Sequence, residues 1–208
     1  MSTQNVPATE SPQKRQAILA QAIATFAEEG FRHADVQVIA DRAGVGKGTV
    51  YRYFGNKEDL FWASTFEVLK RLEEHLLAAM EGIEGALARL RAVSGAYGEF
   101  FESNPQYLEI FVQERAEFRG SAPESHIEYH NKLIDRLAGI VQEGITAGEI
   151  RPVDVRKTII ALGGVLYGSV VHACYMAFDD TLTEMAQYAV DVFLEGIRAD
   201  SAPSQQGT

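Results

Sequence analysis

Apolar residues recur every three or four positions along almost the whole chain, which is the spacing of one face of an α-helix. No stretch alternates apolar and polar residues as a half-buried strand does, and no segment repeats another. The pattern therefore predicts an all-α protein. The expected helices cover residues 11–30, 35–44, 46–54, 56–79, 84–103, 105–118, 124–147, 154–178 and 182–198.

Residues that favour helix ends mark the first four boundaries. Ser11 suits the N-cap of a first helix, with a proline at its first position and a stop at Gly30. Asp35 can cap a short second helix, which Gly44 ends as a left-handed residue. Asn56, with an acidic residue three positions later, caps a long fourth helix of about 24 residues.

The second and third helices have the spacing of a helix-turn-helix. Helices that cross steeply through a short turn need a small residue at their contact, a glycine able to adopt positive φ, and an apolar anchor on the second helix. Ala40, Gly44 and Val50 supply these at spacings of four and six. The third helix is therefore expected to present its outer side to a DNA major groove.

The glycines around Lys47 also invite a phosphate-loop interpretation, which their spacing excludes. A Walker-type loop needs a glycine where the chain has Asp41 and a hydroxyl where it has Gly48. A dinucleotide-binding GxGxxG fails at Thr49 and follows a helical rather than a strand-like segment. We expect these glycines to admit a DNA backbone instead.

Net charge alone would argue against nucleic acid, because the 208 residues carry a formal charge of −10. The charge is unevenly distributed: residues 1–62 hold seven basic and seven acidic side chains, whereas the remainder holds 12 and 22. The basic residues of the first part gather at 42–57, so one edge of this part can still meet phosphates.

Side chains on the third helix and just beyond it have the chemistry of DNA contacts. Thr49, Tyr51 and Arg52 can reach base edges. Tyr53 and Lys57 suit phosphate contacts that set the register. Core packing explains the apolar residues between them, but a core does not favour so many polar and basic side chains on one short element. The predicted DNA-binding residues are Lys47, Gly48, Thr49, Tyr51, Arg52, Tyr53 and Lys57.

The segments ILAQAIATFAEEGF and VQVIADRAGVGKGTVYRYFGNKEDLF resemble, in order and spacing, the TetR family of bacterial one-component regulators. The resemblance implies a homodimer whose third helices enter successive major grooves of a palindromic operator, and a ligand pocket that controls their separation. It covers residues 14–62, and the rest of the chain is similar only in length and helical character. The matching positions are Lys47, Gly48, Thr49, Tyr51 and Tyr53 on the recognition helix and Lys57 on the fourth.

Two positions depart from the family's pattern. Members often have a threonine or serine at the start of the second helix, where this chain has Ala34 and Asp35. The common serine before Lys47 is Gly46. An aspartate can cap the helix but would repel a phosphate, so the usual phosphate contact from this helix end is not expected.

Residues 158–178 form an apolar segment that contains the motif Gly164-x-x-x-Gly168. A transmembrane helix is one interpretation. Polar residues such as His172 interrupt the segment, however, and Asp179 and Asp180 follow it in place of basic or aromatic anchors. We prefer a buried helix at a subunit interface, where glycines permit close approach.

A capping box, Thr181-x-x-Glu184, begins a last amphipathic helix. Two such helices from each chain would form a four-helix dimer interface. The predicted interface residues are Gly164, Gly168, Val171, Met185, Ala189 and Phe193.

Aromatic residues gather between residues 97 and 118 and on the apolar helix. Core packing explains most of them, and some can line a cavity for a flat or hydrophobic small-molecule effector. The candidate pocket residues are Phe66, Phe100, Phe101, Tyr107, Phe111, Tyr167 and Tyr175.

The predicted organisation is an N-terminal three-helix DNA-binding module followed by a larger helical ligand-binding and dimerisation domain. We place the helix-turn-helix domain at residues 11–56 and the larger domain at residues 57–198. The polar ends, residues 1–10 and 199–208, are expected to be disordered.

Other chemistry is weakly represented. His126 and His130 lie four residues apart, a spacing that can share a metal, although a lone pair of this kind is more often a surface feature. The sequence has no nucleophile elbow or cofactor loop, and one cysteine, Cys174, cannot form an internal disulfide or a cysteine-based zinc finger.

The function predicted from these patterns is that of a ligand-responsive transcriptional regulator, most simply a repressor. It would bind double-stranded operator DNA as a homodimer, with no cofactor, no bound metal and no enzymatic activity. The N-terminus lacks the apolar stretch of a secretory signal, so we expect a cytoplasmic protein. Two other classes stay open, namely a helical interaction protein that no longer binds DNA and an all-α enzyme.

Overall fold

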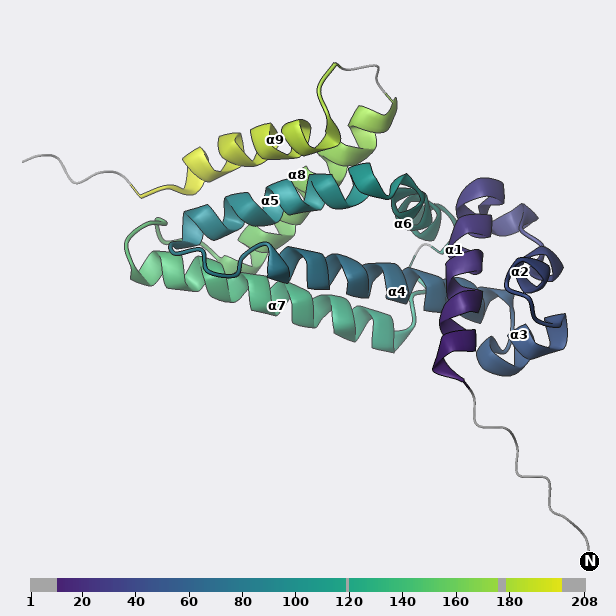
Figure 1. Cartoon of the computed structure of the whole chain (residues 1–208). Helices are drawn as coiled ribbons and strands as arrows, with labels where there is room; N and C mark the ends of the chain where they lie inside the picture. The colour runs from purple at the N-terminus through teal and green to yellow at the C-terminus, as the bar shows by residue number, and fades with distance from the viewer. Residues whose placement is uncertain (1–10, 119, 176–178, 200–208) are drawn as a thin grey trace, which may run out of the picture. The chain divides into compact units, whose positions relative to one another are not determined.

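The computed structural model describes residues 11–118, 120–175 and 179–199. The predicted all-α class is confirmed, and Figure 1 shows the helices in chain order. Most of the two tails predicted to be disordered lies outside the described residues. The helices are α1 (Pro12–His33), α2 (Val36–Arg42), α3 (Lys47–Phe54), α4 (Lys57–Ala78), α5 (Ala86–Ser103), α6 (Pro105–Glu117), α7 (Glu124–Thr146), α8 (Val155–Tyr175) and α9 (Leu182–Ile197).

Local capping determines where these helices begin and end. The carboxylate of Asp35 accepts a hydrogen bond from the backbone N–H of Gln37, and Gly44 adopts a φ of 67° after α2, both as predicted. The capping box that begins α9 is also present. Gly30 leaves helical geometry, with a φ of 76°, but α1 continues for three residues beyond it, so the predicted stop is a break within the helix.

The described residues form two compact units. The head unit comprises residues 11–68, 106–118 and 120–123, and the body unit comprises residues 69–105, 124–175 and 179–199. The first part of α4 and nearly all of α6 therefore belong to the same compact unit as α1, α2 and α3. The predicted helix-turn-helix domain, by contrast, ended at residue 56. That division stays a prediction about function.

Aromatic rings from α1, α4 and the residue that follows α6 form the core of the head unit. Phe26 of α1 and Phe61 of α4 meet edge to face, with ring centroids 5.2 Å apart. Phe118, directly after α6, stacks on Phe61 at 5.2 Å and meets Phe31 at 4.8 Å. Its ring also lies 5.1 Å from Trp62. The end of α6 is therefore part of the core that holds α1 and α4.

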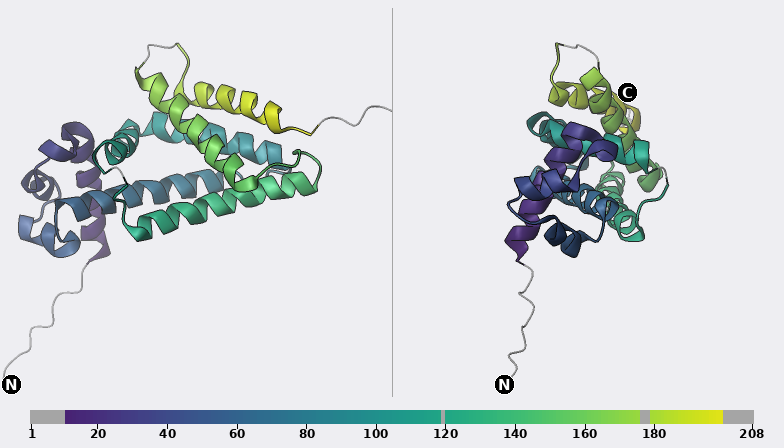
Figure 2. Two further views of the ribbon diagram at one scale, coloured as in Figure 1. Left: turned by 180° about the vertical axis from the view of Figure 1, so that it is seen from behind. Right: turned by 90° about the vertical axis from the view of Figure 1, so that its right-hand side faces the viewer.

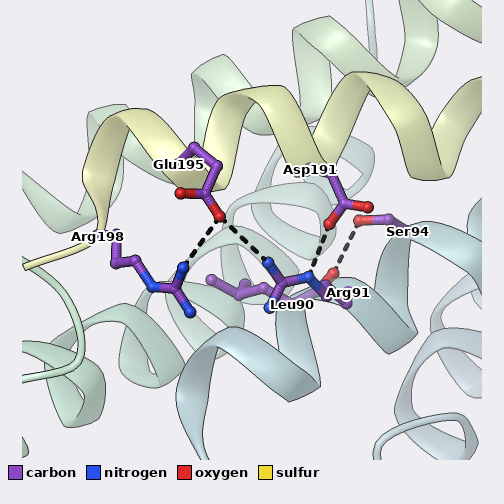
Figure 3. Close-up of polar contacts among 6 residues, drawn as sticks. All are labelled: Leu90, Arg91, Ser94, Asp191, Glu195 and Arg198. Atoms are coloured by element: carbon purple, nitrogen blue, oxygen red, sulfur yellow. Dashed lines mark hydrogen bonds and ion pairs between the residues drawn. The ribbon is translucent and has the colours of Figure 1, made fainter.

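In the body unit, α5 packs closely against α9 (Figure 1). Gly98 lies where the two helices come nearest, because a Cβ atom there would fall 2.6 Å from the Cα atom of Thr183. Arg91 of α5 forms ion pairs with Asp191 at 2.7 Å and Glu195 at 3.9 Å, both on α9 (Figure 3). Small residues and matched charges thus both contribute to this contact.

Helix α8 packs against α9 and α7. In the left view of Figure 2, which shows the molecule from behind, α8 runs obliquely between these two helices. Its buried residues, including Ile159, Leu162 and Leu166, face these neighbours. Among the described residues, no helix combines the length and apolar character that a membrane span requires.

Candidate nucleic-acid interface

The turn between α2 and α3 orients the predicted recognition helix. The backbone N–H of Val45 donates to the carbonyl of Ala40, which closes α2 around the left-handed Gly44. Gly46 then caps α3. Because Val50 and Phe54 of α3 are buried in the head unit, the opposite side of this helix faces solvent.

The predicted DNA-binding residues lie on this outer side. Tyr51 exposes 40% of its surface, and Gly48 and Arg52 are also exposed. No atom lies within 4 Å of a Cβ atom built at Gly48. The fold of the chain itself therefore does not require a glycine at this position. A glycine here would allow a binding partner to approach the helix closely. Lys47, Thr49, Tyr53 and Lys57 are partly exposed.

Two of the predicted contacts are held in place by the head unit. The ammonium group of Lys57 donates a hydrogen bond of 3.1 Å to the carbonyl of Arg32 and lies 5.1 Å from the centre of the Phe31 ring. The hydroxyl of Tyr53 accepts a hydrogen bond of 2.9 Å from the backbone N–H of Ser11. Both side chains are thereby positioned before any partner arrives.

The carboxylate of Asp35 contributes to the electrostatics around α3. Lys47 forms an ion pair of 3.2 Å with Asp35. Hydrogen bonds from the backbone of Gln37 and from Lys47 hold the pKa of Asp35 below its usual value. Burial lowers the pKa of Lys57, and the charges of Asp35 and Glu29 partly oppose this effect.

Sequence patterns did not identify the residues by which α6 holds α1. The side chain of Gln113 accepts a hydrogen bond from the backbone N–H of Phe31 and donates one to the carbonyl of Phe26, each 2.8 Å long. Arg32 and Glu117 form an ion pair of 2.8 Å. These contacts span the break at Gly30, so α6 fixes the end of α1.

The candidate pocket residues are divided between the two units. Phe66, Tyr107 and Phe111 belong to the head unit, whereas Phe100, Phe101 and Tyr167 belong to the body unit. Phe100, Phe101 and Tyr107 are buried, and Phe66, Phe111 and Tyr167 are partly exposed. The side chain of Tyr175 lies outside the described residues. A ligand pocket formed by these residues stays a prediction.

A polar cluster in the body unit was not predicted. Glu73 of α4 accepts a hydrogen bond from the hydroxyl of Tyr129 and forms an ion pair of 2.8 Å with Arg136, both on α7. Burial, and secondarily the carboxylate of Glu73, raise the pKa of Tyr129. His126 is buried and His130 is exposed, so the expectation of a surface pair is wrong for His126. No metal-ligand cluster occurs among the described residues.

The predicted interface residues of α8 and α9 are incompletely buried in the single chain. No atom lies within 4 Å of a Cβ atom built at Gly164 or Gly168, and both glycines are exposed. Val171, Met185, Ala189 and Phe193 are partly exposed. Three larger exposed residues were not included in the prediction, although two of them share the helical face of Met185. They are Ile160, Tyr188 and Val192, which are 52%, 70% and 61% exposed.

Comparison with known protein families matches both parts of the chain. Residues 18–63 match the family described as bacterial regulatory proteins, tetR family. Residues 84–171 match the family described as tetracyclin repressor-like, C-terminal domain.

Individual proteins are similar over most of their length. The fatty acid metabolism regulator protein of Bacillus subtilis is 34% identical over 149 residues, which cover 69% of this chain and 74% of that protein. The HTH-type transcriptional repressor KstR2 of Mycobacterium tuberculosis is 31% identical over 144 residues, which cover 67% and 70%. The crystal structure of the regulator FadR from Bacillus subtilis with stearoyl-CoA matches with a TM-score of 0.74 and 24% identity, covering 88% of this chain and 99% of that one.

Proposed function

Because the chain belongs to the TetR family of bacterial regulatory proteins and is thus a ligand-responsive DNA-binding regulator, we propose that it is a repressor released from its operator by a small molecule. The observation that carries this proposal is the outer side of α3. It presents Tyr51 and Arg52 to solvent, while Val50 and Phe54 anchor the helix from behind.

The operator contacts divide into base reading and positioning. Tyr51 and Thr49 lie in the first turns of α3, from which side chains reach base edges in a major groove. Lys57 and Tyr53 are held by backbone groups of the head unit, as suits contacts that fix the register on phosphates. A palindromic operator follows if two copies bind together.

A homodimer through α8 and α9 is the proposed assembly. Tyr188 and Val192 lie four residues apart on α9, and both are more than half exposed. Open space beside Gly164 and Gly168 would allow a second helix to approach α8 closely. Exposed apolar side chains next to small residues are typical of helix pairs that pack together in an oligomer.

The proposed effector is a long-chain acyl compound, with an acyl-CoA as the candidate to test first. One relative is named a fatty acid metabolism regulator, and a solved structure similar in fold contains stearoyl-CoA. The buried aromatic side chains of the body unit, among them Tyr97, Phe100 and Phe101, would supply the apolar lining that a site for such a chain requires. No catalytic role is proposed for the protein.

Selection of genomic fragments by the purified protein tests the proposal. We expect enrichment of a few fragments that share an inverted repeat, with half-sites about one helical turn apart or a multiple of it. The Tyr51→Ala variant is the control, because it keeps Val50 and Phe54, the buried residues of α3. Enrichment of no fragment by the wild-type protein, or the same fragments at equal yield with the variant, would contradict the proposal.

A further inference from the structure

We propose that Asp35 restrains DNA binding by holding Lys47, so that a DNA phosphate must compete with a carboxylate of the protein itself. The inference rests on the proposed function and assigns to Asp35 a role in setting DNA affinity. Asp35 lies directly before α2, and Lys47 is the first residue of α3. The pair therefore joins the two helices of the helix-turn-helix on its outer side.

The geometry fixes the carboxylate and leaves it accessible. One oxygen of Asp35 accepts hydrogen bonds from the backbone N–H of Gln37 at 2.8 Å and from the ammonium group of Lys47 at 3.2 Å. The side chains of Asp35 and Lys47 are 58% and 39% exposed, so a phosphate can reach both. An exposed ion pair of this kind contributes little to folding. For DNA the carboxylate acts twice, since Lys47 must leave Asp35 to bind a phosphate, and the bound phosphate then lies near the unpaired negative charge of Asp35.

The same carboxylate also acts on a second predicted DNA contact. Asp35 and Lys57 influence each other's pKa through their charges, although no hydrogen bond joins them. A phosphate that approaches Lys57 would therefore meet the repulsion of Asp35 as well. One negative charge thus opposes two contacts that the head unit offers to DNA.

Capping and charge can be separated at this position. Serine and asparagine at an N-cap keep an oxygen that accepts the hydrogen bond from the backbone of Gln37, but both lack the negative charge. Asp35→Ser and Asp35→Asn therefore remove the competitor and retain α2. The matched control is Asp41→Asn, which removes one exposed charge from the same helix, where Asp41 accepts from the side chain of Gln37.

The experiment measures binding to a mixed-sequence DNA duplex and to the fragment selected by the wild-type protein, over a range of salt concentrations. We expect Asp35→Ser and Asp35→Asn to bind both DNAs about three- to tenfold more tightly, with a slope of log affinity against log salt steeper by about 0.9, the value for one additional phosphate contact. Asp41→Asn should change affinity less than about twofold. Equal thermal midpoints would show that the cap is intact.

A double-mutant cycle tests whether the restraint acts through Lys47. In a Lys47→Met background, the gain from Asp35→Ser should fall to about half or less. A full gain in that background, an equal gain from Asp41→Asn, or unchanged binding by the Asp35 variants would overturn the inference. Failure of the wild-type protein and the variants on both DNAs at low salt would instead overturn the proposed function together with it.

Discussion

Lys57, a proposed DNA contact, carries its charge in a partly buried position of the folded chain. Burial lowers its pKa, so the folded state binds this proton less tightly than the unfolded state does. The resulting cost is present at neutral pH, and it is relieved only as the pH rises through the lowered pKa toward the usual value of 10.5. Removal of this charge should therefore leave the fold stable, and a Lys57 variant can report directly on DNA binding.

Substitutions at Tyr51 and Lys57 should weaken DNA binding in different ways. Tyr51→Ala should cost about 1–3 kcal/mol on the operator and relax its specificity, because this exposed side chain is predicted to contact bases. Lys57→Ala should weaken binding to all sequences and reduce the salt slope by about 1. Titrations of operator and mixed-sequence DNA at matched salt distinguish these effects. If both variants bind as the wild type does, α3 is not the recognition helix.

At the scale of elements, α6 stabilises the head unit although it follows α5 in the chain. Gln113 provides partners for two backbone groups of α1 on either side of Gly30, where the helix leaves its regular geometry. Phe118 adds a ring to the aromatic core. A substitution in α6 should therefore alter the position or stability of α1, against which α2 of the helix-turn-helix packs.

Gln113→Ala should destabilise the head unit by about 1–3 kcal/mol, because it leaves a backbone N–H and a carbonyl of α1 without these partners. Trp62 is the only tryptophan of the chain, and its ring centroid lies 5.1 Å from that of Phe118, so it reports on the core of the head unit. Loosening of this core by the substitution should shift the emission of Trp62 to longer wavelength. Denaturant titration followed by tryptophan emission measures both effects. Gln106→Ala, in the first turn of α6, is the control. Equal midpoints for the two variants would exclude this role of Gln113.

Gly98→Ala should destabilise the body unit by about 1–3 kcal/mol, since the added methyl group would meet the backbone of α9 at Thr183 and cannot be accommodated by a side-chain rotation. Gly139→Ala on α7 is the matched control. No atom lies within 4 Å of a Cβ atom built there, and alanine should stabilise that helix by about 0.5–1 kcal/mol. The midpoints of thermal unfolding of the Gly98→Ala and Gly139→Ala variants measure these two effects. A neutral Gly98→Ala would mean that α5 and α9 are less closely packed.

Helix ends were predictable from sequence because caps are local. Asp35, Gly44 and Thr181 act on backbone groups within four residues, and each was predicted in its observed role. The role of α6 was not predictable, since Gln113 and Glu117 bind partners 82 and 85 residues away. Amphipathic spacing shows that a helix has a buried side but does not identify the helix that covers it.

The exposed side of α3 was predictable for a related reason. Short spacing rules decide which side of α3 is buried, so Val50 and Phe54 leave Tyr51 and Arg52 outside. The pair of Asp35 and Lys47 joins two separate helices and depends on their crossing, which no spacing rule specifies. The candidate pocket was least predictable, because aromatic residues pack cores and line cavities with the same composition.

At the scale of the whole molecule, the exposed side of α8 and α9 determines the proposed assembly. Tyr188→Asp and Val192→Asp should convert a dimer to monomers, because a charge buried at a helix–helix contact is not compensated there. Sedimentation velocity measures the change. Gln187→Asp, on an exposed position of the same helix, should leave the assembly intact. Dimers that persist in both apolar-to-charged variants would place the interface elsewhere.

The proposed release by a ligand is a statement about two states of the dimer. Recognition helices of two copies must lie about 34–36 Å apart to enter consecutive major grooves. Helix α4 contributes residues 57–68 to the head unit and 69–78 to the body unit, and we propose it as the element through which a ligand bound by the body would act on the head. At ~1.5 Å per residue, its 22 residues extend about 33 Å.

DNA and effector should therefore weaken each other's binding by the same factor, since linkage between two sites is reciprocal. A coupling of about 1–3 kcal/mol would reduce operator affinity by roughly 5- to 150-fold at saturating ligand. Operator affinity is measured with and without stearoyl-CoA, and stearoyl-CoA affinity is measured with and without operator, with free coenzyme A as the control. If stearoyl-CoA binds the protein but leaves operator affinity unchanged, release by this ligand is excluded. Unequal factors in the two titrations would show that a further equilibrium, such as dissociation of the dimer, contributes to the response.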